Sequence, residues 1–455
     1  MSIALQLSSL DEELSEKITE KCLVQPPKSQ YVVDPQPIEC FAVNEEEDSV
    51  YVPMGQWKEF LDEFPDRKFS RTKVKCKKKL LTLETDTKGY RDQDVIFKEA
   101  LEKLKTEHTV FLALPTGAGK TSLGNYISCH IKLKTAVLCH VDTVNDQWVE
   151  EFQLHSTAKV QRVKGKKPID PTADVYVIGV QKASTIPRDQ LKDIGIVILD
   201  ECHIATITAF SKTLLRFQPR YLIALSATPE RSDGMQKLFT LNFGPKETYI
   251  HRFEVKPFVV YKVEVKYQPK IKYRRVKGRQ VLDWVYAQSS MSTNEEFIDE
   301  VVGDILENVD KRSMVLGDRT GLCESLYAKI YERVTEDVEL LIGKAKKDKQ
   351  DHQILVAGMK KAGVGFNDPT LEALFQVSDT KNVRQFEGRI RTHNNIIYDY
   401  VFDNSTCEAH WKIRQRWYKR RGATIEIICR RDSTAAAERE IALTRRLVPG
   451  GGRKK

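Results

Sequence analysis

Two short stretches of this chain combine residue types that handle phosphate and metal chemistry. The first is LALPTGAGKTS at 112–122, where an apolar run leads into Gly117, Gly119, Lys120 and Thr121 and then into a helical pattern. Glycines let a backbone curl so that its N–H groups point at a phosphate, and the following helix presents its N-terminus to the anion. A lysine in this place reaches the β- and γ-phosphates, and the threonine hydroxyl can hold Mg²⁺. The stretch therefore predicts a loop that binds a nucleoside triphosphate.

We expect this whole turn to contact the nucleotide. Position 114 is a leucine where many phosphate-binding loops have their first glycine, so the strict pattern is missed by one residue. The alternative is a loop–helix junction that merely uses glycine, but the apolar run before it and the helical pattern after it favour nucleotide binding. The candidate ATP-binding residues of the turn are Leu114, Pro115, Thr116, Gly117, Ala118, Gly119, Lys120 and Thr121.

The second stretch is LDECH at 199–203, which ends another apolar run. The carboxyl ends of parallel strands converge at one edge of a sheet, so these acids would meet the phosphate loop there. Asp200 would complete the Mg²⁺ shell, and Glu201 would orient and polarise the attacking water. The alternative is a strand that simply ends in a polar loop, with Cys202 and His203 as accidental neighbours or metal ligands. A metal site lacks partner ligands, and we expect His203 to hydrogen-bond across the domain instead.

Short apolar runs separated by helix-length segments must position these residues. Most of the runs are continuous rather than alternating, which is typical of parallel strands covered by helices on both faces. One series lies at 109–114, 135–141, 174–180, 194–200 and 220–227, and a second at 313–318, 338–343, 354–358, 371–378 and 396–402. The predicted fold class is therefore α/β, with two tandem domains built on parallel sheets.

The two ends of the chain fit neither series. The N-terminal part holds several prolines, an acidic run at 45–48 and a basic stretch at 71–79, which indicates a small, mostly β or irregular accessory region. The C-terminal end has no core-forming pattern. We predict an accessory region at 1–85, a first α/β domain at 86–255, a second at 256–430 and a flexible basic tail at 431–455.

Bulk composition excludes several classes of protein. The chain has 455 residues, of which 41% are hydrophobic and 30% charged, as in a globular protein of two or three domains. The formal charge of +9 hints at a polyanionic partner. The nine cysteines include no Cys-x-x-Cys pair, which argues against a disulfide framework or a zinc ribbon. No stretch reads as a signal peptide or membrane span, so we expect a soluble intracellular protein.

Further motifs extend the pattern along the chain. LPTGAGKT (114–121), DECH (200–203), LSATPERSDG (225–234) and QFEGRIR (385–391) occur in the order and spacing of superfamily-two helicases. The chain resembles the XPB-like branch in particular, and especially its transcript-release relatives in large DNA viruses and phages. The segments VLCHVDTVNDQWVEEF and ILVAGMKKAGVGFNDPTLEALF are similar to that branch's motifs Ia and V. The resemblance implies two RecA-like domains that hydrolyse ATP and act on DNA.

The resemblance also implies residue roles. Arg389 would be an arginine finger at the γ-phosphate, acting with Lys120 and Glu201 in catalysis. The family has another arginine three residues further on, where this chain has Thr392, so either Arg391 takes that role or the site uses one finger. The residues implied to couple hydrolysis to movement are His203, Ser226, Ala227, Thr228, Gly363, Gly365, Gln385 and Gly388.

Two other positions depart from the family's pattern. Motif V usually carries an aspartate where this chain has Asn367, with Asp368 next to it. In GYRDQD at 89–94, Arg91 and Gln93 lie closer together than in the family's adenine-recognition motif. Gln93 is a candidate for adenine recognition, and a solvated turn is the alternative.

Basic residues cluster in two places outside these motifs. One cluster lies at 266–280, and the other at 411–421, where tryptophan and tyrosine are interleaved with arginine and lysine. Grooves that track phosphates need such cations on one face. A solvated loop, or a helix that packs its aromatic side chains on the second domain, is the alternative. The residues we expect to contact nucleic acid are Gln147, Trp148, Arg274, Arg275, Arg420 and Arg421.

Together these patterns predict an ATP-dependent translocase or DNA helicase that uses ATP and Mg²⁺ and, by resemblance, moves 3′ to 5′. Single-stranded or forked DNA or an RNA–DNA hybrid would be its substrate, in transcription, replication or recombination, with that machinery as partner. The alternatives are an RNA helicase or RNA–DNA remodelling ATPase, since DECH and SAT occur there too, and a nucleotide-gated scaffold subunit. We expect a monomer without membrane contact, in the host cytoplasm or nucleus, or in a virion if the source is viral.

Overall fold

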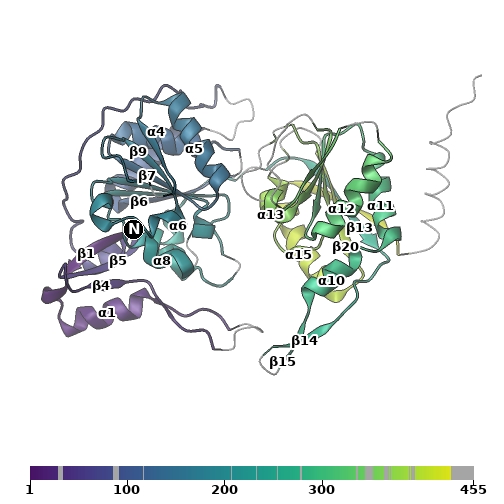
Figure 1. Ribbon diagram of the computed structural model, residues 1–455, viewed down its shortest axis with the longest axis horizontal. Coiled ribbons are helices and arrows are strands. Elements are labelled where there is room, and N and C mark those ends of the chain that lie inside the picture. The colour runs from purple at the N-terminus through teal and green to yellow at the C-terminus, as the bar shows by residue number, and fades with distance from the viewer. Residues whose placement is uncertain are drawn as a thin grey trace, which may run out of the picture. The chain divides into compact units, whose positions relative to one another are not determined.

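The computed structural model divides into two compact units, Met1–Glu254 and Val255–Lys455 (Figure 1). We describe each unit by itself. The structure describes residues 1–28, 34–85, 92–115, 117–165, 167–205, 208–231, 233–253, 255–276, 279–334, 337–343, 352–362, 368, 370–388, 390 and 395–431.

The first unit is built on a seven-stranded sheet in the order β12-β6-β11-β10-β7-β9-β8, with all neighbouring strands parallel. Its strands are β6 (Thr109–Ala113), β7 (Thr135–Cys139), β8 (Val160–Val163), β9 (Val175–Gly179), β10 (Ile196–Asp200), β11 (Tyr221–Ser226) and β12 (Ile250–His251). Every residue of the central strands β6, β7 and β10 is buried, which is why the sequence shows continuous rather than alternating apolar runs. The five predicted strands of this unit are confirmed, and β8 and β12 are additional.

Helices flank this sheet, and the local sequence sets where they begin. They are α3 (Gln93–Glu107), α4 (Lys120–Ile131), α5 (Asp142–His155), α6 (Val180–Ala183), α7 (Cys202–Ala205), α8 (Thr208–Leu214) and α9 (Lys237–Phe243). The Asp92 side chain caps α3 by accepting from the Val95 N–H, whereas α4 begins after Gly119, which has a left-handed φ of 82°. Shorter 3₁₀ turns lie at Leu7–Ser9, Met54–Gln56, Arg188–Leu191 and Lys246–Thr248.

The N-terminal segment forms a small antiparallel sheet in the order β1-β5-β4 beside helix α1 (Figure 1). Its elements are β1 (Ser2–Gln6), α1 (Glu12–Cys22), β2 (Leu23–Val24), β3 (Ile38–Glu39), β4 (Ala42–Asn44), β5 (Ser49–Pro53) and α2 (Trp57–Phe60). Met1 and Met54 are fully buried in the same hydrophobic cluster as Phe111 of β6 and Phe239 of α9. This segment therefore shares a core with the large sheet.

The second unit repeats the architecture with a seven-stranded parallel sheet in the order β17-β18-β16-β19-β20-β13-β21. Its strands are β13 (Phe258–Val265), β16 (Ser313–Gly317), β17 (Val338–Leu341), β18 (Ile354–Gly358), β19 (Ala373–Gln376), β20 (Ile396–Phe402) and β21 (Ala423–Cys429). Its helices are α10 (Trp284–Met291), α11 (Glu295–Leu306), α12 (Thr320–Tyr331), α13 (Met359–Ala362), α14 (Arg384–Glu387) and α15 (Ser405–Arg420). The predicted second series of strands is confirmed, and β13 and β21 extend it.

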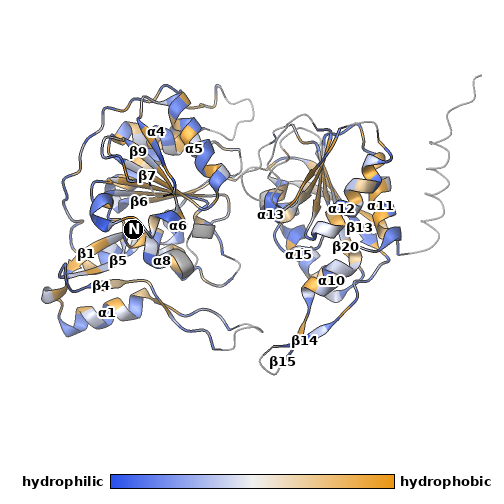
Figure 2. Cartoon of the chain, viewed as in Figure 1, coloured by the Kyte–Doolittle hydropathy of each residue, from blue (hydrophilic) through white to orange (hydrophobic). Residues whose placement is uncertain are grey.

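One ribbon stands out from the second unit. Strands β14 (Tyr273–Val276) and β15 (Arg279–Leu282) pair in antiparallel register and project away from α10 (Figure 1). In Figure 2 the strands of both large sheets are coloured mainly hydrophobic, while the helices carry hydrophilic and hydrophobic stretches, as expected where one face packs on the core. Among the described residues, no helix is both long enough and apolar enough to cross a membrane.

Candidate nucleotide-hydrolysis site

The predicted phosphate loop connects β6 to α4. Gly117 and Gly119 have left-handed φ values of 87° and 82°, a conformation that glycine adopts at little cost. A Cβ atom at Gly119 would lie 2.2 Å from Nε2 of Gln93, so the close approach also requires glycine. The loop is therefore shaped by the residues that the motif predicts, although Thr116 lies outside the described residues.

Gln93 lies against the loop backbone. Its side chain is 3% exposed, its Nε2 donates to the Ala118 carbonyl at 3.1 Å, and its Oε1 accepts from the Leu81 N–H at 3.1 Å. Gln93 thus braces the phosphate loop, while its contact with adenine stays a prediction. Arg91 lies outside the described residues.

Lys120 folds back over the loop that precedes it. Its Nζ donates to the carbonyls of Leu114 at 3.2 Å and Pro115 at 3.4 Å. Since a phosphate oxygen is a stronger acceptor for an ammonium than a carbonyl is, a bound nucleotide would compete for these hydrogen bonds. The geometry fits the predicted role of Lys120 at the β- and γ-phosphates.

The sheet brings the acid pair to the same edge as the loop. Strand β11 lies between β10 and β6, and the register pairs Asp200 with Leu225 and Leu225 with Leu112. Asp200 is 8% exposed, and burial together with the neighbouring Glu201 raises the pKa of its carboxyl above the ordinary value. A nearby cation would relieve this cost of burying a charge.

Trp148 holds Asp200 from within the core. The indole is completely buried, and its Nε1 donates to Oδ2 of Asp200 at 2.7 Å. A Cβ atom at Gly124 of α4 would lie 2.8 Å from the indole, so the ring is wedged between the helix after the phosphate loop and the acid. The predicted nucleic-acid contact of Trp148 is therefore wrong, because the side chain has no exposed surface. Its neighbour Gln147 is exposed on α5.

Glu201 has an unusual backbone conformation. Its φ is 46°, in the left-handed region that favours glycine, and its N–H donates to Oδ1 of Asp200 at 2.9 Å. The turn separates the two carboxylates, since one is buried and the other is partly exposed. This arrangement suits one acid to a metal and the other to a water molecule.

His203 links the acid pair to the turn after β11. Its Nδ1 lies 3.0 Å from Oγ of Ser226 and 3.3 Å from Oε2 of Glu201, and Ser226 Oγ accepts from the Thr228 N–H at 3.0 Å. Burial, with Arg231 and Lys120 adding to it, lowers the pKa of His203 to about 4, so the ring is neutral at physiological pH. The expected hydrogen bond across the domain is present, and Ala227 lies between Ser226 and Thr228 in the turn. Burial raises the pKa of the Cys202 thiol well above its ordinary value, so this cysteine stays protonated.

The residues at this edge fit Mg²⁺ bound jointly with a nucleotide. Among the described residues, no group of three or more His, Cys, Asp or Glu side chains could hold a metal by itself. Mg²⁺ is commonly held by one or two protein oxygens together with phosphates and waters. The Thr121 hydroxyl and the Asp200 carboxylate would supply such a pair when a nucleotide is bound.

Comparison with known proteins agrees with this geometry. Residues 86–231 match the family described as "Type III restriction enzyme, res subunit". The protein 161L of Invertebrate iridescent virus 6, named a helicase, is 28% identical over 411 residues, which is 83% of this chain and 90% of the relative. L396 of Acanthamoeba polyphaga mimivirus, named an ATP-dependent RNA helicase, is 25% identical over 69% of this chain and 64% of its own length.

Two further matches bear on the branch and on the fold. "DNA 3'-5' translocase XPB2" of Sulfurisphaera tokodaii is 28% identical over 147 residues, 32% of this chain and 33% of the relative. The solved structure "S. cerevisiae Dbp5 bound to RNA and ADP BeF3" is similar in fold, with a TM-score of 0.53 at 14% identity, over 76% of this chain and 92% of that one. By its sequence and fold, the chain is an ATP-hydrolysing helicase of superfamily two. The resemblance seen in the sequence is confirmed, and the two parallel sheets are its tandem RecA-like folds.

The helicase's motifs V and VI are only partly described. Gly363, Gly365, Arg389 and Arg391 lie outside the described residues, so their predicted roles stay predictions. Gln385 belongs to the short helix α14, and Gly388 follows at the end of that helix.

Helix α15 of the helicase supports α14 directly. Nε of Arg421 lies 3.1 Å from Oε2 of Glu387, and both side chains are at least 96% buried. Trp417 donates from Nε1 to the same carboxylate at 3.3 Å, and the Arg384 guanidinium lies 4.7 Å from its ring centroid. The predicted nucleic-acid contact of Arg421 is therefore wrong, because its charge is neutralised inside the protein. Arg420 is exposed.

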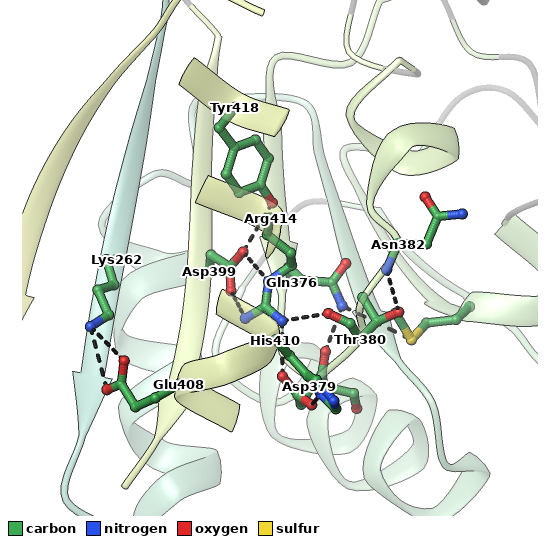
Figure 3. Close-up of polar contacts among 12 residues, drawn as sticks. Lys262, Gln376, Asp379, Thr380, Asn382, Asp399, Glu408, His410, Arg414 and Tyr418 are labelled. Atoms are coloured by element: carbon green, nitrogen blue, oxygen red, sulfur yellow. Dashed lines mark hydrogen bonds and ion pairs between the residues drawn. The ribbon is translucent and has the colours of Figure 1, made fainter. Parts of the chain in front are cut away.

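A second set of contacts fixes the loop between β19 and α14 (Figure 3). Arg414 is fully buried, forms paired hydrogen bonds at 2.8 Å with the two carboxylate oxygens of Asp399, and reaches Asp379 at 2.8 Å. His410 also hydrogen-bonds to Asp379, and Tyr418 donates to Asp399 at 2.9 Å. The stretch of chain that leads into motif VI is thus held to α15 by a buried network in which Arg414 bridges two carboxylates.

Sequence reasoning missed this bracing role of α15. The signal was present in the spacing, because Trp411, Arg414, Tyr418 and Arg421 recur at intervals of three or four residues and are the buried positions of that stretch. Arg414 and Arg421 are charged, and their charge favoured the prediction of a solvent-facing basic cluster. A helical face on which arginines alternate with aromatic residues is equally a pattern for buried ion pairs.

Proposed function

We propose that this helicase is a DNA translocase that couples ATP hydrolysis to 3′ to 5′ movement and to strand separation. The observation that carries the proposal is the acid pair at the end of β10, whose buried member Asp200 is held by Trp148 beside the phosphate loop. The partial match to a protein named a DNA 3'-5' translocase supports the choice of DNA and of direction. The QFEGRIR form of motif VI differs from the His-Arg-Ile-Gly-Arg form of RNA helicases.

In this proposal each residue at the edge of the first sheet has one task. Lys120 neutralises the β- and γ-phosphates, and Thr121 with Asp200 holds Mg²⁺, which would offset the charge that develops on the phosphates. Glu201 orients the water for attack in line with the leaving group. Arg389 would supply the arginine finger that stabilises the charge on the transferred phosphate.

The neutral His203 provides the connection to movement. Its Nδ1 lies within 3.3 Å of both Glu201 Oε2 and Ser226 Oγ, so a change in the hydrogen bonds of Glu201 would reach the turn after β11 through this one atom. This turn, motif V and motif VI then carry the nucleotide state to the bound strand. The same proposal assigns the ATP-binding domain to residues 86–255, the second RecA-like domain to 256–430, the accessory region to 1–85 and the tail to 431–455.

The proposed nucleic-acid contacts are exposed side chains on both units. Arg274 and Arg275 lie exposed on the β14–β15 ribbon beside Tyr273, which is 60% exposed. Gln147 on α5 and Arg420 on α15 are exposed as well. Arginine beside an exposed aromatic ring is suited to phosphate contact and base stacking.

The deciding experiment measures ATPase activity and strand displacement on single-stranded DNA, forked DNA, RNA and an RNA–DNA hybrid. We expect DNA to stimulate hydrolysis, and we expect Lys120→Ala and Glu201→Gln to abolish it, with Glu201→Gln still binding ATP. ATPase activity that no nucleic acid stimulates would remove the motor assignment. Normal hydrolysis by Glu201→Gln would remove the role of Glu201.

An RNA helicase is the second candidate, because a relative that matches 69% of this chain is named an ATP-dependent RNA helicase. The two candidates differ in whether the protein reads the 2′-hydroxyl of the loading strand. A series of loading strands with increasing 2′-OH substitution separates them. Stimulation that rises with 2′-OH content would favour RNA. The third alternative, a scaffold that does not hydrolyse ATP, disagrees with the matches to helicases.

A further inference from the structure

A row of unpaired lysines crosses the outside of the first unit. Lys73, Lys75, Lys77 and Lys79, here called the basic ridge, are all exposed, while Val74 between them is 5% exposed. This alternation is that of an extended chain with one face inward and the other toward solvent. All four charges therefore point away from the protein along one line.

The backbone under the ridge is fixed to the domain. The Thr72 N–H donates to the Lys132 carbonyl at 3.0 Å, the Lys77 N–H to the His155 carbonyl at 2.8 Å, and the Thr157 N–H to the Lys75 carbonyl at 3.0 Å. Antiparallel bridges pair Arg71 with Leu133 and Cys76 with Ser156. The segment thus runs across the C-terminal ends of α4 and α5, and the lysines are presented in a set order.

The side chain of Lys78 points inward and has protein partners, whereas among the described residues no ion pair is found for the side chains of the four ridge lysines. Nζ of Lys78 lies 2.7 Å from Oγ of Ser122 and 3.4 Å from Oε1 of Glu151. In the part of the chain that the structure describes, none of the ridge lysines has a carboxylate within 4.0 Å of its ammonium group. Four like charges held in a row without counter-charges repel one another, which an anionic partner would relieve.

The length of the row fits a polyphosphate backbone. From Lys73 to Lys79 an extended chain spans about 20 Å, which is roughly the rise of six phosphates along one strand of a duplex. A membrane surface would instead call for apolar side chains beside the cations, and the exposed large hydrophobic residues of the described chain include none between 66 and 80.

We propose that the basic ridge is a second nucleic-acid contact surface, which binds the phosphate backbone independently of base identity. Its four lysines lie on the flank of the first unit formed by α4 and α5, and none of them is among the residues assigned to hydrolysis. It would raise the affinity for the strand without taking part in hydrolysis. The inference needs nucleic acid as the substrate but does not depend on the choice of DNA over RNA.

The test replaces all four ridge lysines by glutamine and measures binding of a labelled single strand at several salt concentrations. We expect affinity to fall roughly tenfold at low salt, and the slope of log affinity against log salt to shrink by up to about 0.7 per lysine. The nucleic-acid concentration for half-maximal ATPase should rise by a similar factor, while basal ATPase and the maximal stimulated rate stay unchanged.

The matched control removes the same charge from exposed lysines of the same unit that already have partners. Lys21, Lys58, Lys98 and Lys246 pair with Glu59, Glu107, Asp94 and Glu230, respectively. We expect Lys→Gln changes at these four positions to leave the salt slope close to wild type, and four Lys→Arg changes in the ridge to keep wild-type affinity. Pairwise changes at 73 and 75 or at 77 and 79 should each give about half of the slope change.

Three results would overturn the ridge assignment. The ridge variant could bind like wild type, the control could weaken binding as much, or the ridge variant could lose binding only to anionic phosphatidylserine vesicles. In each of these three cases nucleic acid would still stimulate the ATPase, so the proposed function itself would stand. Absence of that stimulation in the wild type would instead count against the proposed function.

Discussion

Glu201 and Trp148 show how single side chains set the geometry of hydrolysis. Glu201 adopts a left-handed backbone conformation that costs a residue with a side chain on the order of 1–3 kcal/mol. The turn gives Asp200 and Glu201 different surroundings although they are adjacent in sequence. Trp148 then supplies the hydrogen bond that orients the more deeply buried of the two acids.

Trp148→Phe should weaken metal use more than folding. Phenylalanine keeps most of the ring packing but removes the N–H, so Asp200 loses the donor at Oδ2. We expect the Mg²⁺ concentration for half-maximal ATPase to rise about tenfold, the lower end of the effect of removing a group that orients a metal ligand. Titrating Mg²⁺ at fixed ATP measures this.

The control for this change is Trp57→Phe. Trp57 lies in the same unit and donates from Nε1 to the Glu107 carbonyl at 3.1 Å, outside the hydrolysis residues. Its Mg²⁺ requirement should equal that of the wild type. An unchanged requirement in Trp148→Phe as well would show that the indole acts in packing alone.

At the scale of elements, helix α15 supports the segment that leads into motif VI. Arg414 and Trp417 of this helix and Arg421 at its C-terminal cap hold α14 and the loop before it, and that segment leads into the predicted finger at Arg389. The contact from Arg421 to Glu387 is an ion pair inside the protein, where loss of one partner leaves an uncompensated charge.

Arg421→Gln should therefore lower the maximal nucleic-acid-stimulated ATPase rate by tenfold or more while changing KM for ATP little. Its distinctive readout is a combination with Arg389→Ala. If Arg421 acts by positioning the finger, the double variant should be no slower than Arg389→Ala alone. Steady-state ATPase measurements on the three variants decide this.

The comparison variant is Arg333→Gln on the same unit. Arg333 forms an exposed ion pair with Asp299 at 3.0 Å and should show wild-type kinetics. A double variant that is slower than Arg389→Ala in proportion to the single effects would mean that Arg421 affects the enzyme by another route.

The strands and the first-unit chemistry could be predicted from sequence because their signals are local. Continuous apolar runs mark buried parallel strands, and the turn at Gly117–Thr121 needs its glycines whatever surrounds it. The partners of Trp148 and Arg421 lie 52 and 34 residues away in the chain. Nothing local separates an arginine that meets a buried glutamate from one that meets a phosphate. The N-terminal sheet was missed in detail because its strands are only two to five residues long.

At the scale of the molecule, the N-terminal segment and the large sheet of the first unit have one continuous core. Met54 is fully buried with Phe111 and Phe239, which belong to the large sheet and to α9. A second cluster joins Ile3 and Val52 of the small sheet to Leu238 of α9. A segment with this burial should unfold together with the domain it covers.

Met54→Ala should accordingly destabilise the whole first unit by about 2–5 kcal/mol, as expected for a buried methionine cut to alanine. Urea unfolding followed by circular dichroism and by the buried Trp148 fluorescence should show both signals shifting together. Val43→Ala on the edge strand β4, where the side chain is 52% exposed, is the control and should shift neither. Early loss of the N-terminal segment with an unshifted Trp148 signal would contradict a shared core.

The contact between Gly124 and Trp148 also limits how this enzyme can change over evolutionary time. A side chain at 124 would collide with the indole. A smaller residue at 148 would leave a void and would leave Asp200 without its hydrogen-bond donor. A substitution at only one of the two positions should therefore give a less active enzyme. Both positions would have to change together for activity to be kept. The packing thus couples two residues that 23 positions separate in the printed sequence.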